Sequence, residues 1–389
     1  MASTAGYYAA FVGLGIALGV IGPTLPGLAR QTHSGLDALG FLFTARALGY
    51  MLGSLRGGRL YDRLPGHTVA ALGIVAIAAL LALIPLVPLL WLLVAVVFVL
   101  GISDSVLDVG GNTLLVRQHG DKSGPFMTAL HFFFGVGAFV APIVVGWAIS
   151  ASGNIAWAYW GLAVLVVPPA LWLIRQPSPA ARMESEATAE GSTDVALVAL
   201  IALLFFFYVA VEAGFAGWVS SYAVATGLAG EAEAAYLASA FWGVFTLGRL
   251  AAIPISSRVR PRYVLLADIV GAMIFLGFIC LMPQSRLALW AGAVGTGLFL
   301  ASIFPTNLNL ASRRITLTGR ITGIFFSVGS LGGMTLPLLL GQLFVRVSPQ
   351  SAMVALWLDT GLMLVVWAAL MLRTEQVARA RGASLVAEH

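Results

Sequence analysis

Three polar side chains recur at one-turn spacing within a long apolar stretch. Asp104, Asp108 and Asn112 stand at i, i+4 and i+8 between residues 89 and 116. In a helix this spacing places them on one face, at steps of about 6 Å. An ionised carboxylate that faces lipid costs roughly 2.5 to 3.5 kcal/mol even on the most lenient insertion scale. We therefore expect this face to line a cavity or to meet a partner helix, where it can bind a proton or a sodium ion together with a solute.

The two carboxylates allow two interpretations. As neighbours of like charge, Asp104 and Asp108 are expected to share one proton and to couple ion binding to the solute. The alternative is a structural ion pair with an arginine, for which Arg46 in the apolar stretch 36–57 is the candidate. Intramembrane ionisable groups are functional by default, which favours ion coupling.

A second group of candidates lies in the other half of the chain. Tyr208, Glu212 and Phe215 follow one helical face, and an acid among aromatic rings suits a hydroxylated ring as ligand. Aromatic residues at this spacing also serve packing or interfacial belts. Asn307 follows Pro305, whose kink can direct a polar side chain inward. We predict that Asn112, Glu212, Asn307, Tyr208 and Phe215 bind the solute.

The elements that carry these residues are predicted to be membrane spans. Of the 389 residues, 60% are hydrophobic and only 10% are charged, which is too much apolar surface for one soluble core. Apolar stretches of about 20 residues predict an all-α integral membrane protein. The spans are expected near residues 5–27, 36–57, 68–85, 89–116, 125–150, 155–174, 195–222, 233–257, 262–281, 287–311, 319–344 and 351–373.

The basic residues predict the orientation of the spans. With the amino terminus inside, 17 of the 21 Lys and Arg residues lie on or beside inside segments, as the positive-inside rule requires. We expect a multi-pass protein of the cell inner (plasma) membrane with both termini cytoplasmic. The net charge of +5 is spread over short loops, so it does not indicate nucleic-acid binding.

A polar stretch divides the chain at its midpoint. Residues 175–194 read as a cytoplasmic linker between a bundle of six spans at 1–174 and a second one, followed by a cytoplasmic tail, at 195–389. A repeat supports this division: Gly137, Pro142 and Gly146 have the same spacing as Gly332, Pro337 and Gly341. Such glycines also serve close helix packing alone. Repetition in both halves nevertheless favours two pseudo-symmetric bundles around a central cavity, as in secondary transporters.

Several classes of protein are excluded by what the sequence lacks. The single cysteine, Cys280, allows no internal disulfide and no multi-cysteine metal site. No phosphate-binding loop, metal-ligand cluster or nucleophile and base pair is found. We therefore expect neither an enzyme nor a cofactor or metal site. Transport is expected to be driven by a gradient. The transporter is expected to be a monomer.

The segment between the second and third spans carries a family resemblance. Residues 58–67, Gly-Arg-Leu-Tyr-Asp-Arg-Leu-Pro-Gly-His, resemble the signature loop of the major facilitator superfamily, with one extra residue before the glycine and His67 where a basic pair is usual. Asp62 can pair with Arg63 or with a basic residue of a neighbouring helix. Arg249 stands in the same Gly-Arg-Leu tripeptide as Arg59. We expect Asp62, Arg63, Arg59 and Arg249 to form a conformational latch. The alternative is a solvated loop that only anchors the orientation of the spans.

Further segments are similar to one branch of this superfamily, the sodium-dependent glucose transporters and their relatives the fucose-proton symporters. These segments are residues 22–25, 31–34, 108–112, 123–132, 241–243, 248–249 and 302–305. In that pattern Asp108 and Asn112 match family positions, whereas Asp104 has no counterpart. The resemblance implies the major facilitator fold, sugar-type solutes and coupling to a cation, H⁺ or Na⁺. It predicts a secondary active transporter of a small hydroxylated solute such as a hexose; the alternative is a proton-coupled efflux antiporter for amphipathic compounds.

Overall fold

The computed structural model describes residues 2–179, 194–315 and 319–387. All regular elements in these ranges are helical. In the first half they are α1 (Ala2–Gly19), α2 (Ile21–Thr32), α3 (Leu36–Arg63), α4 (Gly66–Leu83), η1 (Ile84–Leu86), α5 (Leu90–His119), η2 (Gly120–Lys122), α6 (Ser123–Ser152) and α7 (Ala156–Leu173). In the second half they are α8 (Val195–Ala225), α9 (Glu231–Arg258), α10 (Pro261–Leu281), α11 (Arg286–Leu300), α12 (Ile303–Ser312), α13 (Gly319–Arg346) and α14 (Pro349–Ala387).

The predicted count of twelve spans is confirmed. Twelve helical stretches are long and apolar enough to cross a membrane. Two spans are interrupted: α1 ends before Val20 and α2 begins after it, and α11 and α12 are separated by Ala301 and Ser302. The sequence predicted a kink at Pro305 but not the positions of these interruptions. Pro23 and Pro305 cannot donate a backbone hydrogen bond to the carbonyls of Gly19 and Ala301, four residues earlier, and their rings crowd those carbonyls.

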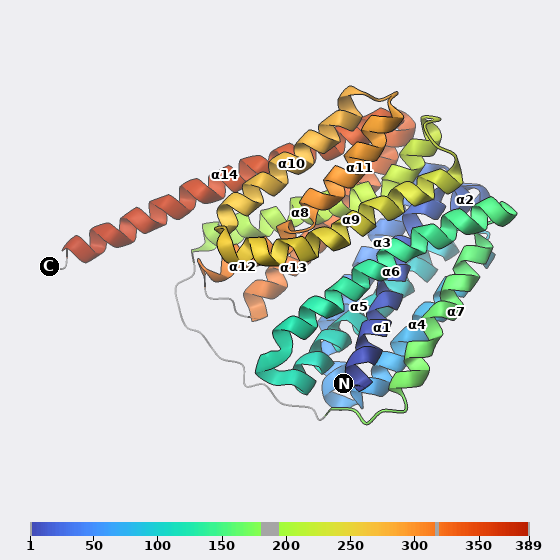
Figure 1. Cartoon of the computed structure of the whole chain (residues 1–389), viewed down its shortest axis with the longest axis horizontal. Helices are drawn as coiled ribbons and strands as arrows, with labels where there is room; N and C mark the ends of the chain where they lie inside the picture. The colour runs from blue at the N-terminus through green and yellow to red at the C-terminus, as the bar shows by residue number, and fades with distance from the viewer. Residues whose placement is uncertain (1, 180–193, 316–318, 388–389) are drawn as a thin grey trace.

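The helices form two bundles that lie side by side. Figure 1 shows α1 to α7, coloured blue to green, on one side and α8 to α14, coloured green to red, on the other. Because the number of spans is even, the first span begins and the last span ends on the same side of the molecule. We call this the termini side and the opposite one the far side; α3, for example, runs from the far side to the termini side.

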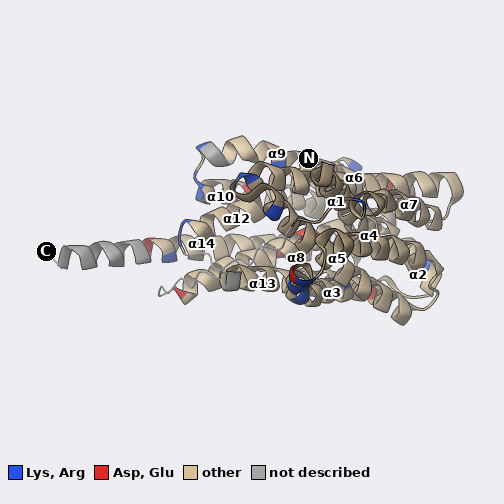
Figure 2. Ribbon diagram, turned by 90° about the horizontal axis from the view of Figure 1, so that it is seen from below, with Lys and Arg blue, Asp and Glu red and all other residues tan. Residues whose placement is uncertain are grey.

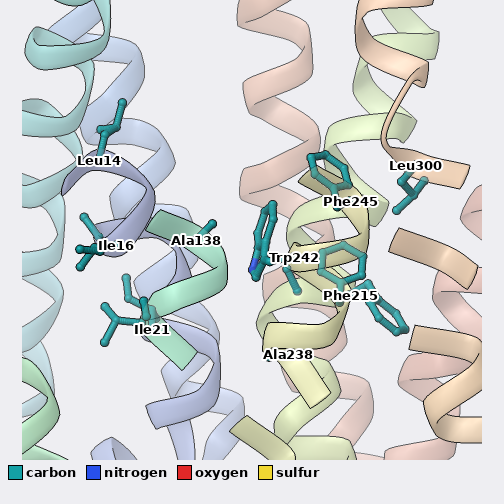
Figure 3. Packing of buried hydrophobic residues seen from close by; sticks show 14 of the residues in the cluster. Leu14, Ile16, Ile21, Ala138, Phe215, Ala238, Trp242, Phe245 and Leu300 are labelled. Atoms are coloured by element: carbon teal, nitrogen blue, oxygen red, sulfur yellow. The ribbon is translucent and has the colours of Figure 1, made fainter. Parts of the chain in front are cut away.

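Charged residues are sparse along the spans. In Figure 2 most of the ribbon is tan, and the few blue and red segments lie mainly at helix ends. Apolar side chains fill the space between the helices, as the close view in Figure 3 shows for both halves. The charged residues that do lie inside spans therefore need a specific partner or a function.

The predicted repeat corresponds to equivalent packing contacts in the two bundles. A Cβ atom on Gly137 of α6 would lie 2.0 Å from the carbonyl oxygen of Val12 in α1, and one on Gly332 of α13 would lie 2.1 Å from that of Phe206 in α8. In each half the glycine lets the fifth span touch the backbone of the first. These two glycines therefore serve close helix packing, and they do so at equivalent positions in the two halves.

Gly332 provides a test of this close contact. We expect Gly332→Ala to lower the unfolding midpoint, because a methyl group cannot fit against the Phe206 carbonyl without moving α13, at a cost of about 1 to 3 kcal/mol. The matched control is Gly323→Ala in the same helix, where a Cβ atom meets nothing within 4 Å. Thermal unfolding of the purified proteins should separate the two variants; equal midpoints would contradict the packing.

Both ends of the central linker are attached to their own bundle. The ring of His67, at the start of α4, accepts a hydrogen bond from the Tyr7 hydroxyl (2.7 Å) and donates one to the Gln176 carbonyl (3.0 Å). The backbone N–H of His67 bonds the Ser178 hydroxyl at 2.9 Å. At the other end, Asp194 pairs with Arg373 of α14 at 3.0 Å. Most of the predicted linker, residues 180–193, lies outside the described residues.

Candidate functional site

The polar face of α5 is matched residue by residue by α3. The two helices run parallel and approach closely at Gly49 and Gly101, where a Cβ atom would lie 2.1 Å from the facing carbonyl oxygen. Because both helices have the same period, partners on α3 and α5 keep a constant separation of 58 residues. Two residues one turn apart on α5 therefore meet two residues one turn apart on α3.

The first of these pairs is a buried ion pair. Arg46 donates from Nε (2.9 Å) and Nη2 (2.6 Å) to Oδ2 of Asp104, whose side chain is only 2% exposed. The alternative interpretation of Asp104 as the structural partner of Arg46 is thus confirmed. Each of the two carboxylates has hydrogen-bond partners of its own, and the sharing of one proton between Asp104 and Asp108 stays a prediction.

The second pair leaves Asp108 without a cation in contact. Tyr50 donates a hydrogen bond to Oδ2 of Asp108, and the amide of Asn112 donates to its Oδ1 at 2.9 Å. Both donors are neutral, and Asp108, Asn112 and Tyr50 are all partly exposed. An ionised Asp108 would therefore keep its full negative charge. Tyr50 was not predicted from the sequence, although its one-turn spacing from Arg46 could have indicated it.

Glu212 lies on α8, in the opposite half, beside Tyr208 and Arg249. It is partly exposed, and it interacts electrostatically with the Arg249 guanidinium and with the Tyr208 hydroxyl. The Tyr208 hydroxyl is buried without a hydrogen-bond partner. Among the described residues, no ion pair within 4.0 Å joins Glu212 to Arg249. The structure thus places Tyr208 and Glu212, two of the predicted solute-binding residues, beside each other. Arg249, which the sequence analysis assigned to the latch, lies with them.

Phe215, a predicted solute contact, is instead a packing residue in this structure. Its side chain is fully buried and its ring lies 5.2 Å from that of Phe241. The reason is that α8 is covered on this face by α9. On α9, Trp242 packs on Phe241 and Phe245 and is itself buried, and Figure 3 shows its ring on the side of this cluster that faces the first half.

Asn307 is buried between α12 and α8. Its amide nitrogen lies 3.3 Å from the carbonyl of Ile201, and its Oδ1 has no hydrogen-bond partner. One turn along α12, the ring of Phe304 packs 6.0 Å from that of Tyr208. With 1% of its surface exposed, Asn307 does not reach a solute in this conformation.

The predicted latch residues are not assembled. Asp62 bonds a basic residue of a neighbouring helix, Arg117 of α5, at 2.6 Å, but both belong to the first half. Arg59 and Arg63 are exposed at the end of α3. Arg249 is not with them, because α9 continues nine residues beyond it whereas α3 continues only four beyond Arg59. At 1.5 Å per residue this difference places Arg249 about 7.5 Å deeper.

The contacts between the halves lie toward the far side instead. Within the described residues every hydrogen bond that joins the two halves falls between the middle of the spans and the far side. These bonds are Arg30 to Glu231 (2.9 Å at the second oxygen), Thr44 to the Met334 carbonyl (2.8 Å), Ser239 to the Phe139 carbonyl (2.8 Å) and Gln342 to the Asp37 carbonyl (3.1 Å). The molecule is therefore closed on the far side.

Comparisons with known sequences identify relatives over most of the chain. The chain is 32% identical over 377 residues to sodium-dependent glucose transporter 1A of Mus musculus, covering 86% of this chain and 88% of that protein. It is 29% identical over 373 residues to sodium-dependent glucose transporter 1 of Homo sapiens, with 86% and 72% covered. Identity to major facilitator superfamily domain-containing protein 4A of Mus musculus is 25% over 435 residues, with 87% and 85% covered.

Solved structures show the same fold. A mutant of the nucleoside transporter NupG superimposes with a TM-score of 0.77 at 12% identity, over 95% of this chain and all of that one. A bacterial homologue of the human lysosomal transporter Spinster, in an inward-facing and unoccupied conformation, gives 0.74 at 13% identity over 96% of both chains. A sequence profile of the Major Facilitator Superfamily matches residues 7–337. The chain belongs to the major facilitator superfamily, in the branch of the sodium-dependent glucose transporters.

Proposed function

We propose that this protein is a cation-coupled transporter of a small hydroxylated solute, with a hexose as the first candidate, and that it works by alternating access. The observation that carries the proposal is that each half holds a partly exposed acid inside a span, Asp108 on α5 and Glu212 on α8. Asp108 and Asn112 offer acceptors to a cation and to solute hydroxyls. Glu212 offers charge-assisted hydrogen bonds from the opposite side.

The relatives support the choice of solute and ion. The proteins with the highest identities given above are named for sodium-dependent glucose transport. A hydroxylated ring also gives the buried polar groups of both halves the hydrogen bonds that lipid cannot provide. The termini side is proposed to face the cytoplasm, because the basic residues gather there.

Uptake and stability measurements test this proposal. Radiolabelled D-glucose should accumulate in proteoliposomes under an inward Na⁺ or H⁺ gradient and should exchange without one. A panel of sugars, each tested with and without sodium, should raise the unfolding midpoint of the purified protein selectively. If no sugar stabilises the protein or is transported, whereas amphipathic compounds are expelled against a proton gradient, the proposal is wrong.

The ion pair on the far side gives a test of alternating access. Arg30 on α2 and Glu231 on α9 are 59% and 28% exposed, so their pairing is worth about 0.2 to 1 kcal/mol. We expect Arg30→Gln to raise the population that is open on the far side by a factor of about 1.4 to 5. Spin labels at the exposed Leu89 and Leu287, in a cysteine-free background, would report a larger share of long distances.

The control for this experiment is a second ion pair on the same side. Arg286 pairs with Glu233, but both belong to the second half. Arg286→Gln should therefore leave the distance distribution between the labels unchanged. An equal response of both variants would show that Arg30 does not hold the halves together.

A further inference from the structure

Arg249 lies well inside a span, and no ion pair is found for it within the part of the chain that the structure describes. It stands nine residues before the end of α9, with its guanidinium carbon 4.6 Å from the centre of the Phe245 ring. Its Nε is buried without a hydrogen-bond partner, and no ion pair within 4.0 Å is found for it among the described residues. A cation at this depth is costly unless it is paired or serves transport. The neighbours of Arg249 therefore decide what it does.

Arg249 has an acid on its own half and a polar link to the other half. Glu212 and Arg249 attract each other across the Tyr208 hydroxyl. His131 of α6 interacts electrostatically with Asp108 in its own half and, across the interface, with Arg249 of α9. From α1, His131 meets only the edge of the Phe11 ring, 5.9 Å away. The packing of α6 on α9 supports this link: a Cβ atom on Gly135, one turn from His131, would lie 2.2 Å from the hydroxyl oxygen of Thr246, three residues before Arg249. These contacts relate Asp108 to His131, His131 to Arg249, and Arg249 to Glu212.

The charges of these groups do not balance. Arg46 and Asp104 cancel each other in direct contact. With both carboxylates ionised, Asp108 and Glu212 contribute two negative charges; Arg249 contributes one positive charge and a neutral His131 none, so one negative charge remains in that state. The interactions recorded for Asp268 and Asp359, the other acids buried in spans, do not involve these residues. At low local dielectric an uncompensated charge is strongly unfavourable, and one bound cation would remove it.

We propose that Arg249 is the shared counterion of Asp108 and Glu212, and that one monovalent cation per solute completes the charge balance between the halves. This inference rests on the proposed function of the same site. Without the cation, Asp108 competes with Glu212 for Arg249. A cation bound at Asp108, or a proton on His131, repels Arg249 toward Glu212 and so transmits its binding to the half that holds the other side of the solute. By linkage, the solute strengthens cation binding by the same factor.

Neutral substitutions change this balance in defined steps. Glu212→Gln leaves no net charge, Arg249→Gln leaves two negative charges, and the double variant returns to one. We expect D-glucose binding to the parent protein to tighten roughly tenfold or more when NaCl replaces choline chloride, or when the pH is lowered. The effect of Na⁺ or of low pH on D-glucose affinity should fall below about twofold in Glu212→Gln. It should return to roughly tenfold in the double variant. Arg249→Gln alone should need two cations or lose binding.

Arg258→Gln is the matched control, because Arg258 is an exposed arginine at the end of the same helix. It should behave as the parent protein does. The same series is measured without sugar, as the dependence of the unfolding midpoint on Na⁺ and on pH. This second readout follows the charge balance even if D-glucose is not the solute.

The outcomes separate the two proposals. A cation response of the midpoint that disappears in Glu212→Gln and returns in the double variant supports the shared counterion whether or not sugar binds. Unchanged cation dependence in Glu212→Gln, or no recovery in the double variant, would overturn it. Sugar binding that needs no cation in any of the proteins would also overturn it while leaving sugar transport in place. Failure of every sugar, with the midpoint pattern intact, would reject only the proposed solute.

Discussion

Replacing Asp108 with asparagine should abolish gradient-driven accumulation of solute while leaving exchange across the membrane. Asp108 is the partly exposed carboxylate whose contacts, Tyr50 and Asn112, are neutral donors, so the amide removes the charge that attracts the cation and keeps the shape of the site. The accumulation ratio in proteoliposomes should fall from roughly tenfold or more to about one. Exchange of labelled for unlabelled D-glucose should continue, because the pathway between the halves is not altered.

Two further variants sharpen this prediction. Tyr50→Phe removes one donor to Asp108 but not its charge, so coupling should be weakened rather than lost. Glu233→Gln removes a carboxylate that is paired with Arg286 on the far side, and it should leave accumulation intact. Concentrative uptake by Asp108→Asn at the level of the parent protein would show that the cation binds elsewhere.

Replacing Asp104 with asparagine should damage the fold rather than the coupling. The Arg46 and Asp104 side chains are 15% and 2% exposed, and removal of one partner from a buried ion pair leaves a buried charge at a cost of about 3 to 5 kcal/mol. The purified variant should unfold at a clearly lower temperature, and its yield should drop. Although the two residues are one turn apart, Asp104→Asn is thus expected to lower stability, whereas Asp108→Asn is expected to abolish coupling.

Rescue and control variants distinguish pairing from a direct role of Asp104. Changing both partners to apolar residues, Arg46→Met with Asp104→Leu, should recover most of the lost stability, because no charge is left unpaired. Asp62→Asn breaks the pair with Arg117, but the Asp62 side chain is 60% exposed, so the loss should stay below about 1 kcal/mol. If the double apolar variant transports but no longer accumulates solute, Asp104 also contributes to coupling.

The sequence predicted the spans and the polar face of α5 well, since both follow from local patterns. Hydropathy over 20 residues determined the number of spans, and the spacing of Asp104, Asp108 and Asn112 determined their common face. Arg46 could be named as the partner of Asp104 because few intramembrane cations were available. The breaks at Val20 and Ser302 were not predicted, because a nearby proline shows that a helix can bend but not where.

The errors concern properties that depend on neighbouring helices. Arg249 was assigned to a latch because its tripeptide repeats that of Arg59, yet its depth depends on how far α9 continues. Phe215 was assigned to the solute because it shares a face with Glu212, yet whether that face is open depends on α9. The interaction of His131 with Arg249 depends on the contact of α6 with α9, whose residues are more than 100 positions apart in the chain.

The attached ends of the linker have a consequence for how the two halves stay together. His67 fixes the chain up to Ser178 on the first bundle, and Arg373 fixes Asp194 on the second. About 15 residues remain between these points, enough to span ~50 Å when extended. At that length the connection does not by itself limit how far the two attachment points can separate. The covalent link therefore ensures that each bundle has one partner, whereas the contacts on the far side determine how the two fit together.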